Sequence, residues 1–239
     1  MDLRNANVSH RLFYYLKLLL LGSVILSACF ILNRMHLSQF FPISTVRIYG
    51  AHHIEQKEIE TVLLPLLKPG YFNVNIEHIR NELGELAWIR DSSVKRAWPD
   101  AIDIVLIEKK PVAYWNNQAL LSESGDIFTP KRETYPVLLP ELIGPDGQQI
   151  MVLNYFKDID RLLLPLHVKM TRLELTPYLT WKLTLDNGMI LQIGHKDILT
   201  RLDHFVKVYP KIVGERAKDV ESVDLRYSNG VAVRWKVPS

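Results

Sequence analysis

The side chains in this sequence that could bind a metal or transfer a proton are few and unfavourably spaced. His52, His53 and Glu55 in "HHIE" form the most metal-like group, but adjacent histidines on a turn seldom face one ion. Asp203 and His204 are neighbours in a predicted helix, so their side chains point apart. We therefore interpret the first group as an exposed turn and expect no shared chemistry from the second.

Other catalytic templates are missing from the sequence as well. It contains no G-x-S-x-G turn, no phosphate-binding glycine loop and no H-E-x-x-H helix. The nearest carboxylate pairs fit solvated faces better than acid–base catalysis; they are Asp100 with Asp103 and Glu58 with Glu60. The sequence therefore predicts a protein that is not an enzyme, with no catalytic residue, cofactor, metal site or small-molecule substrate.

The composition indicates a folded protein that does not bind nucleic acid. The chain has 239 residues, of which 48% are hydrophobic and 23% are charged, enough for two modest domains. Its net charge is only +3, and no run of Lys and Arg is interleaved with aromatic residues. Cys29 is the single cysteine, which excludes an intrachain disulfide and a thiolate metal cage.

A long apolar segment lies near the amino terminus. A membrane-spanning helix needs about 20 residues, and residues 12–32 are long enough, with Lys17 as the one charged residue. Three signals could produce such a segment: a cleaved secretory signal, a lipoprotein signal ending in the "LSAC" of Cys29, or a permanent anchor. The run is longer than a secretory apolar region and continues as "FIL" beyond Cys29, which favours an anchor with an unmodified cysteine. We therefore predict a single transmembrane helix over residues 12–33.

The flanking charges give this anchor an orientation. Arg4, Arg11 and Lys17 lie on its amino-terminal side, against Arg34 on the carboxyl side. Because positively charged flanks stay in the cytoplasm, we predict a cytoplasmic tail at residues 1–11. The rest of the chain then lies outside, in the periplasm of a cell that has one.

Residues 43–111 predict a small domain in which two helices cover one sheet. Alternating polar and apolar residues predict its strands, and apolar residues at helical spacing predict its helices. Pro99 fits the turn between the last two strands, because proline cannot sit in a central strand. The elements follow in the order strand, helix, helix, strand, strand, over residues 44–50, 54–67, 75–89, 92–98 and 101–108.

Residues 112–239 predict a mostly antiparallel β domain with two helices, which makes the chain as a whole α+β. The helices are expected near residues 148–164 and 198–209, and "YPVLLPELIGPDG" is expected to be an irregular crossing. The strand candidates are "VAYWNN", "ALLSESGDIFT", "VKMTRLELT", "WKLTLDNGMILQIG" and "ESVDLRYSNGVAVRW", with turns near Asn187-Gly188 and Asn229-Gly230.

The last hairpin predicts which residues share a face. A two-residue loop would place Tyr227 opposite Ala232 and Leu225 opposite Arg234, mixing apolar and charged side chains. A three-residue loop, Ser228 to Gly230, separates them, and it requires a bulged type I turn with Gly230 at φ > 0. The apolar face then holds Val223, Leu225, Tyr227, Val231, Val233 and Trp235, and the opposite face holds Asp224, Arg226, Ala232 and Arg234.

The final strand is expected at the edge of the sheet, where unpaired backbone groups can accept a strand from another chain. Because arginine can bind a carboxylate with two hydrogen bonds, we predict that a partner adds a strand here and brings a Glu or Asp to Arg226. Two alternatives stay open: the arginines only protect the edge from aggregation, and Tyr227 belongs to the core. The predicted partner-binding residues are Arg226, Tyr227, Ser228, Asn229, Gly230, Val231, Arg234 and Trp235.

Several motifs, in this order, resemble one known family. "WIRDSSVKRAWPDAIDIVLIEKKPVAYW" carries Trp88-Ile89, a "WPD" turn and "PVAYW"; the others are "YFNVN", "LLSESGDIF", "LPELIGPDG", "WKLTLDNG", "RLDHFVKVYP" and "VDLRYSNGVAVRW". Over nearly all of residues 43–236, the combination resembles the POTRA-plus-β region of the bacterial cell-division proteins called FtsQ in Gram-negative organisms and DivIB in Gram-positive ones. The short tail and the few residues after the last strand fit the Gram-negative, FtsQ branch.

The resemblance implies a non-enzymatic scaffold of the division septum, in the inner membrane. It implies that residues 43–111 are a POTRA domain associated with recruitment, and that the β domain at 112–239 holds the bitopic partners FtsB and FtsL. FtsK and the septal peptidoglycan synthases are further candidate partners. Such a scaffold links early division components to the synthesis of septal peptidoglycan.

Three weaker interpretations accompany this one. The POTRA strand around Ser92 to Val94 is a candidate recruitment edge, with ordinary sheet pairing as the alternative. A POTRA-containing factor for envelope protein assembly or transport is the rival function, although such proteins usually carry repeated POTRA units and a barrel. A periplasmic enzyme of wall metabolism is a second rival, which the missing catalytic residues disfavour.

Overall fold

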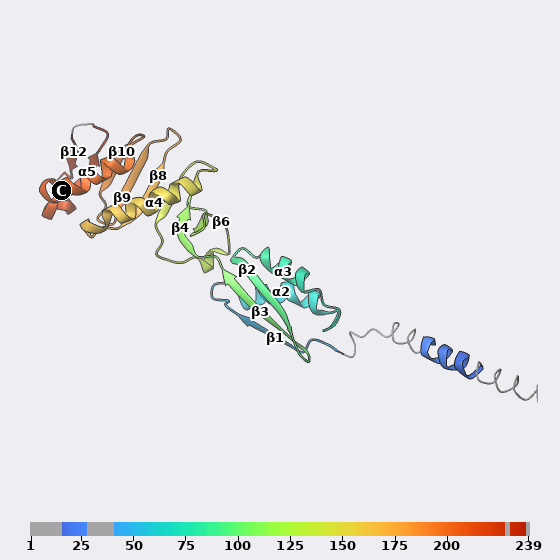
Figure 1. Ribbon diagram of the computed structural model, residues 1–239. Helices are drawn as coiled ribbons and strands as arrows, with labels where there is room; N and C mark the ends of the chain where they lie inside the picture. Colours follow the sequence, from blue (N-terminus) through green and yellow to red (C-terminus); the bar gives the residue numbers. More distant parts are fainter. Residues whose placement is uncertain (1–15, 28–40, 228–229, 238–239) are drawn as a thin grey trace, which may run out of the picture. The chain divides into compact units, whose positions relative to one another are not determined.

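The computed structural model describes residues 16–27, 41–227 and 230–237. Figure 1 shows these residues as helices, strands and loops. Several of the sequence-based predictions lie outside them: the cytoplasmic tail at 1–11, Cys29, and the turn residues Ser228 and Asn229.

The described part of the apolar segment is a helix over residues 16–27, whose leucine side chains are exposed. Within the described ranges, no helix is both long enough and apolar enough to cross a membrane. The predicted span over residues 12–33 extends beyond this helix at both ends, onto residues outside those ranges.

The chain forms two compact units, and each is considered by itself. The first contains the residues up to 49 together with 56–83 and 92–105, and the second contains 50–55, 84–91 and 106–239. The predicted domain boundary between residues 111 and 112 stays a prediction.

The amino-terminal sheet has the predicted element order. Its strands lie in the order β1-β3-β2, and β1 runs parallel to β3 with Thr45 opposite Ala101. Side chains on β3 alternate between the core and the other face, and Ile102 and Ile104 are fully buried. The elements are β1 (Thr45–Tyr49), α2 (Gln56–Leu67), α3 (Ile76–Gly84), β2 (Ile89–Ala97) and β3 (Ala101–Glu108).

Local sequence signals explain both helices of this sheet. Ile59 and Leu63 lie one turn apart on α2 and are buried, and the helix continues through Pro65, where the sequence predicts an end or a kink, to Leu67. Asn75 caps α3, because its Oδ1 accepts a hydrogen bond from the backbone N–H of His78 at 3.1 Å.

The carboxyl-terminal sheet has nine strands, in the order β12-β11-β10-β9-β8-β7-β4-β5-β6. Antiparallel pairs predominate over parallel ones, which confirms the mostly antiparallel prediction. The strands are β4 (Pro111–Trp115), β5 (Ala119–Ser122), β6 (Ile127–Phe128), β7 (Glu141–Ile143), β8 (Met170–Leu175), β9 (Trp181–Leu185), β10 (Ile190–Gly194), β11 (Val220–Asp224) and β12 (Ala232–Trp235).

Two long helices pack on this sheet, as predicted. They are α4 (Gln149–Leu163) and α5 (Ile198–Ile212), which lie against each other, with α4 on β7 and β8 and α5 on β10 (Figure 1). Buried residues of both helices and of the central strands form one core, in which Leu173, Leu191 and Phe205 are almost completely inaccessible. Short 3-10 segments lie at Arg132–Thr134, Leu164–Leu166 and Gly214–Asp219.

The segment "YPVLLPELIGPDG" is not wholly irregular, and this expectation was wrong at β7. Glu141–Ile143 pairs in parallel with β4 on one side and β8 on the other, and Leu142 is fully buried. Three residues between a proline and a glycine are too few to show alternation, so tertiary pairing alone defines this strand.

Candidate functional site

β12 lies at the edge of the nine-stranded sheet, as predicted. It pairs with β11 and with no other strand among the residues that the structure describes. A strand in this position has a row of backbone N–H and C=O groups that can pair with an added strand.

The register of the last hairpin differs from the predicted one. Asp224 lies opposite Ala232 and Val223 opposite Val233, whereas a three-residue loop would put Asp224 opposite Arg234. The predicted pairing of Tyr227 with Val231 is therefore wrong, and the last observed pair leaves a wider connection than Ser228 to Gly230.

The neighbouring strand explains this difference. β11 runs parallel to β10, with Gln192 opposite Asp224, and the backbone N–H of Leu225 donates to the carbonyl of Gln192 at 2.8 Å. The chain thus follows β10 past Asp224 before it turns. Gly230 also does not have the predicted positive φ.

The predicted separation of faces is largely confirmed, since a shift of two residues keeps side chains on the same side. Val223 and Leu225 are buried, and Val231, Val233 and Trp235 pack on the same core from the half-buried side. Tyr227 is the exception, with 61% of its surface exposed. The alternative that Tyr227 belongs to the core is therefore wrong.

Arg226 already has a partner within the chain. Its Nε lies 2.9 Å from Asp224 Oδ1 and its Nη2 lies 2.6 Å from Asp224 Oδ2. The side-chain hydrogen bonds from Arg226 lower the pKa of Asp224, and the same bonds raise the pKa of Arg226. A partner carboxylate at Arg226 would have to compete with Asp224.

Arg234 differs from Arg226 in this respect. It is an exposed residue of β12, on the face that carries Ala232. Within the described ranges, Arg234 has no ion-pair partner and makes no side-chain hydrogen bond. Of the two predicted arginines, Arg234 is the one that can bind a carboxylate without displacing another.

Trp235 is held mainly by its own chain. The Arg216 guanidinium lies 4.3 Å from the centre of its ring, in the range of a cation–π contact. The backbone N–H of the next residue, Lys236, donates to the Asp219 carbonyl at 2.7 Å. Both contacts fix the end of β12 against the 3-10 segment at Gly214–Asp219.

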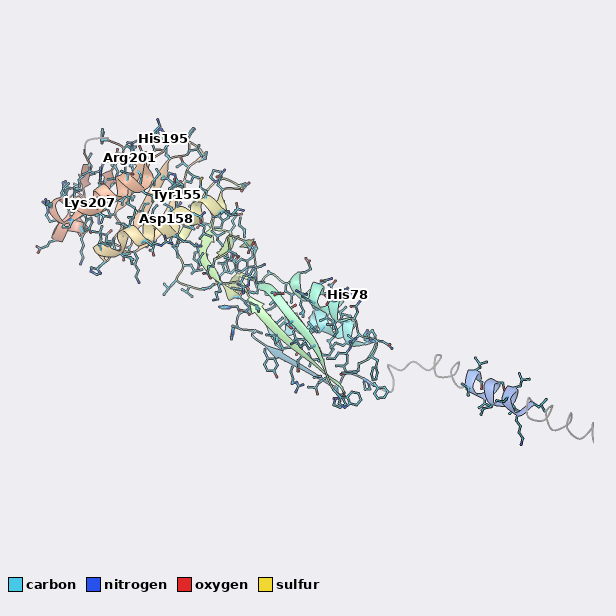
Figure 2. All side chains as sticks on the ribbon, viewed as in Figure 1. His78, Tyr155, Asp158, His195, Arg201 and Lys207 are labelled. Atoms are coloured by element: carbon cyan, nitrogen blue, oxygen red, sulfur yellow. The ribbon has the colours of Figure 1, made fainter. Side chains whose placement is uncertain are left out.

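A hollow of about 690 Å³ lies between α5 and the connection that joins β11 to β12. Leu225, Tyr227, Gly230 and Val231 line one wall, so three predicted partner-binding residues border it. The α5 wall contributes Asp197, Thr200, Arg201, His204, Lys207, Val208 and Ile212. Figure 2 shows Arg201 and Lys207 on this helix.

The α5 wall of this hollow carries more basic than acidic side chains. Arg201 donates from Nη1 to the Ile193 carbonyl at 2.9 Å, and Lys207 Nζ lies 2.5 Å from Asp203 Oδ2. His204 also lines the hollow, and Asp197 is the acidic residue of the lining. The hollow thus combines apolar side chains with charged ones. No sequence pattern had indicated it, because its walls are far apart in the chain.

The weaker candidate site on β2 has a different character. β2 is an edge strand of its three-stranded sheet, but the side chains of Ser92 and Val94 are both buried. The strand still offers its backbone and the exposed side chains of its other face, such as Ser93 and Lys95. The buried side chains of Ser92 and Val94 cannot themselves contact a partner.

The "HHIE" turn is more organised than the exposed turn that we expected. Glu108 Oε1 accepts hydrogen bonds from the backbone N–H groups of His52, His53 and Ile54 at 2.8 to 3.2 Å, and Glu108 Oε2 lies 2.7 Å from His53 Nδ1. The His53 ring stacks on Trp88 with 4.5 Å between the ring centres. Burial alone would raise the pKa of Glu108, but these hydrogen bonds lower it.

This cluster is structural in character. Glu108 acts as an anion bound in a cradle of backbone N–H groups, and the indole N–H of Trp88 donates to Thr134 Oγ1 at 2.9 Å. Among the described residues, no group of three or more His, Cys, Asp and Glu side chains is placed to hold a metal ion. The sequence predicted the strand that ends at Glu108 but not this arrangement, because Glu108 and the turn that it binds are more than 50 positions apart.

The fold and the exposed edge define a POTRA-plus-β protein, and comparison with known sequences agrees. Residues 41–109 match the family described as "POTRA domain, FtsQ-type", and residues 113–226 match "Cell division protein FtsQ/DivIB, C-terminal". The second match ends at Arg226, so β12 lies beyond it.

Complete proteins give the same result. The chain is 37% identical to the cell division protein FtsQ of Coxiella burnetii over 203 residues, covering 84% of each chain. It is 33% identical to that of Escherichia coli strain K12 over 226 residues, covering 91% of this chain and 82% of the relative. The chain belongs to the FtsQ/DivIB family of cell-division proteins, which is not a known enzyme family.

Proposed function

We propose that this protein is a non-enzymatic, single-pass scaffold of the inner membrane at the division septum. Its tail at residues 1–11 is cytoplasmic, residues 12–33 span the membrane and the rest is periplasmic. It binds FtsB and FtsL, and through them and other division proteins links early components to septal peptidoglycan synthesis. The observation that carries the proposal is the free edge of β12 beside the hollow under α5.

Strand addition at β12 is the proposed binding mode. The backbone edge supplies affinity that depends little on side chains, and the flanking side chains supply specificity. Exposed Tyr227 offers a rigid aromatic ring of the kind that often anchors interfaces. The hollow under α5 then receives the part of the partner that precedes or follows the added strand.

Charge favours an acidic partner segment. Arg234 is free to bind a carboxylate, and Arg201 adds a positive charge to the lining of the hollow, where Lys207 is already paired with Asp203. We therefore transfer the predicted carboxylate contact from Arg226 to Arg234. Arg226 instead holds Asp224 and so fixes the shape of the connection next to the binding edge.

The test compares two exposed tyrosines of the same sheet. Tyr227 is 61% exposed beside the proposed site and Tyr178 is 88% exposed in the turn before β9. Tyr227→Ala should weaken retention of FtsB and FtsL on the immobilised full chain at least tenfold, and Tyr178→Ala should leave it unchanged. Arg234→Glu should weaken it similarly, because it places a like charge against the acidic partner.

Circular dichroism and thermal melting establish that each variant is folded. Equal retention of both partners by folded Tyr227→Ala, folded Arg234→Glu and the unmodified chain would contradict the proposed site. Loss of retention in Tyr178→Ala alone would place the interface on another part of the sheet.

A further inference from the structure

Three exposed aromatic side chains gather at one end of the amino-terminal sheet. Trp98 is 72% exposed, Phe72 is 50% exposed and Phe41 is 39% exposed. They come from the segment before β1, the loop before α3 and the turn between β2 and β3. The start of β1 and the start of β3 are paired, so these segments lie at the same end of the sheet (Figure 1).

Ring contacts join these residues into one cluster. The Phe41 and Phe72 rings meet edge to face with 5.0 Å between their centres. Tyr71, which is buried, contacts Phe72 at 5.3 Å and Trp98 at 6.1 Å between ring centres. Tyr71 thus supports the Phe72 and Trp98 rings directly, and Phe72 in turn contacts the Phe41 ring.

Hydrogen bonds fix the backbone beneath the cluster. The N–H of Tyr71 donates to the Phe41 carbonyl at 2.9 Å. Arg96 donates from Nε to the Tyr71 carbonyl at 2.9 Å and from Nη2 to the Val74 carbonyl at 2.6 Å. Because the backbone is fixed, the exposed rings form a preorganised apolar surface.

We propose that this aromatic end of the POTRA domain docks on the outer face of the lipid bilayer. The inference rests on the proposed anchor at residues 12–33. Residues 34–40 can extend at most roughly 25 Å, so Phe41, already fixed to the POTRA domain, is tethered close to the membrane surface. Tryptophan and other aromatic rings favour the membrane–water interface, where one side of the ring is apolar and the other is wet.

One basic side chain near the cluster in the sequence suits the same occupant. Lys68, exposed in the loop that leads to Tyr71, carries an ammonium group that can reach lipid phosphates. The tether length favours the bilayer over a distant protein. A connection of seven residues keeps the cluster close to the membrane in which the chain is anchored. Docking would hold the POTRA domain beside the membrane instead of leaving it on a free tether.

Tryptophan quenching by brominated lipids tests the proposal in the full chain. The five tryptophans of the chain all lie outside the apolar segment, so insertion of the anchor alone brings no indole into lipid. In phosphatidylcholine vesicles, brominated chains should quench the intact protein, and Trp98→Phe should remove more than half of that quenching. Trp235→Phe, which changes a half-buried indole on β12, is the matched control and should leave the quenching unchanged.

A second variant and a flotation assay separate the possible outcomes. Phe72→Ser should also reduce quenching without a change in the melting temperature. If the protein floats with vesicles but Trp98→Phe is quenched as strongly as the intact chain, docking is overturned and the anchor stands. If the protein does not float, the anchor proposal fails and docking fails with it. Shielding of Trp98 from both brominated lipid and aqueous acrylamide would overturn the bilayer as occupant in favour of a second copy of the chain.

Discussion

At the scale of single residues, charge pairing separates the structural residues from those available to a partner. Arg226 and Arg234 look equivalent in the sequence, but Arg226 is bound to Asp224 and Arg234 is unpaired within the described part of the chain. Glu108 is likewise committed to the turn that contains His52 and His53. These intrachain contacts depend on the folded geometry, so they cannot be predicted from residue type alone.

Glu108 gives a pH-dependent prediction at this scale. Its hydrogen bonds lower its pKa below the usual glutamate value of 4.5, so the carboxylate stabilises the folded state at pH values above 4.5. That stabilisation is lost as the pH falls through the lower, folded-state pKa. Glu108→Gln should therefore reduce the free energy of unfolding at pH 7 by about 1 kcal/mol, because a neutral acceptor forms weaker hydrogen bonds than a charged one.

Chemical unfolding at a series of pH values measures this effect. The difference between Glu108→Gln and the unmodified chain should disappear at low pH, where Glu108 itself becomes protonated. Glu133→Gln, a change in an exposed residue of the segment at Arg132–Thr134, should follow the unmodified chain. A difference for Glu108→Gln that stays constant from pH 7 to pH 3 would contradict a role for the charge.

At the scale of elements, close packing at the end of β10 shapes the binding edge. Gly194 has φ +91, and a Cβ there would lie 3.1 Å from Arg201 Nη1 and 3.2 Å from Arg226 Cγ. β10 supports β12 indirectly, because β11 lies between them in the sheet. At Gly194, β10 also lies close to Arg201, which lines the hollow. Position 194 requires glycine for two reasons: its backbone conformation is left-handed, and a side chain there would crowd Arg201 and Arg226.

Two glycine substitutions test this interpretation. Gly194→Ala should lower the free energy of unfolding by about 1 to 3 kcal/mol, the cost of a left-handed conformation for a residue with a Cβ. Gly230→Ala should be tolerated, because Gly230 does not have φ in the left-handed range and a Cβ there would meet no atom within 4 Å. Thermal melting of both variants measures the difference, and equal destabilisation would restore the bulged-turn prediction for Gly230.

Much of the element order could be predicted from the sequence, and the failures have definite causes. The β1-α2-α3-β2-β3 order and helices α4 and α5 follow from periodicity, because each buries one regular face. β7 was missed because three residues carry no periodic signal. The hairpin register was missed because it depends on hydrogen bonds to β10, which is distant in sequence. The β12 edge was predicted, whereas the hollow beside it needs the fold to bring α5 to the β11–β12 connection.

At the scale of the whole molecule, each of the two units carries one surface for which we propose a binding role. The family is one of cell-division proteins, and the two proposed contacts serve such a role in different ways. The aromatic end of the POTRA domain is proposed to meet the membrane, and the β12 edge is proposed to meet FtsB and FtsL. Each unit then has one surface with a separate occupant.

Amide hydrogen exchange across β12 tests the central claim most directly. In the full chain, the backbone amides of Ala232–Trp235 should exchange at least tenfold more slowly when FtsB and FtsL are bound, because an added strand pairs with the free edge. The amides of β2 at Ile89–Ala97 should keep the same rates and serve as the internal reference. Binding of FtsB and FtsL that leaves exchange in Ala232–Trp235 unchanged would contradict strand addition at β12.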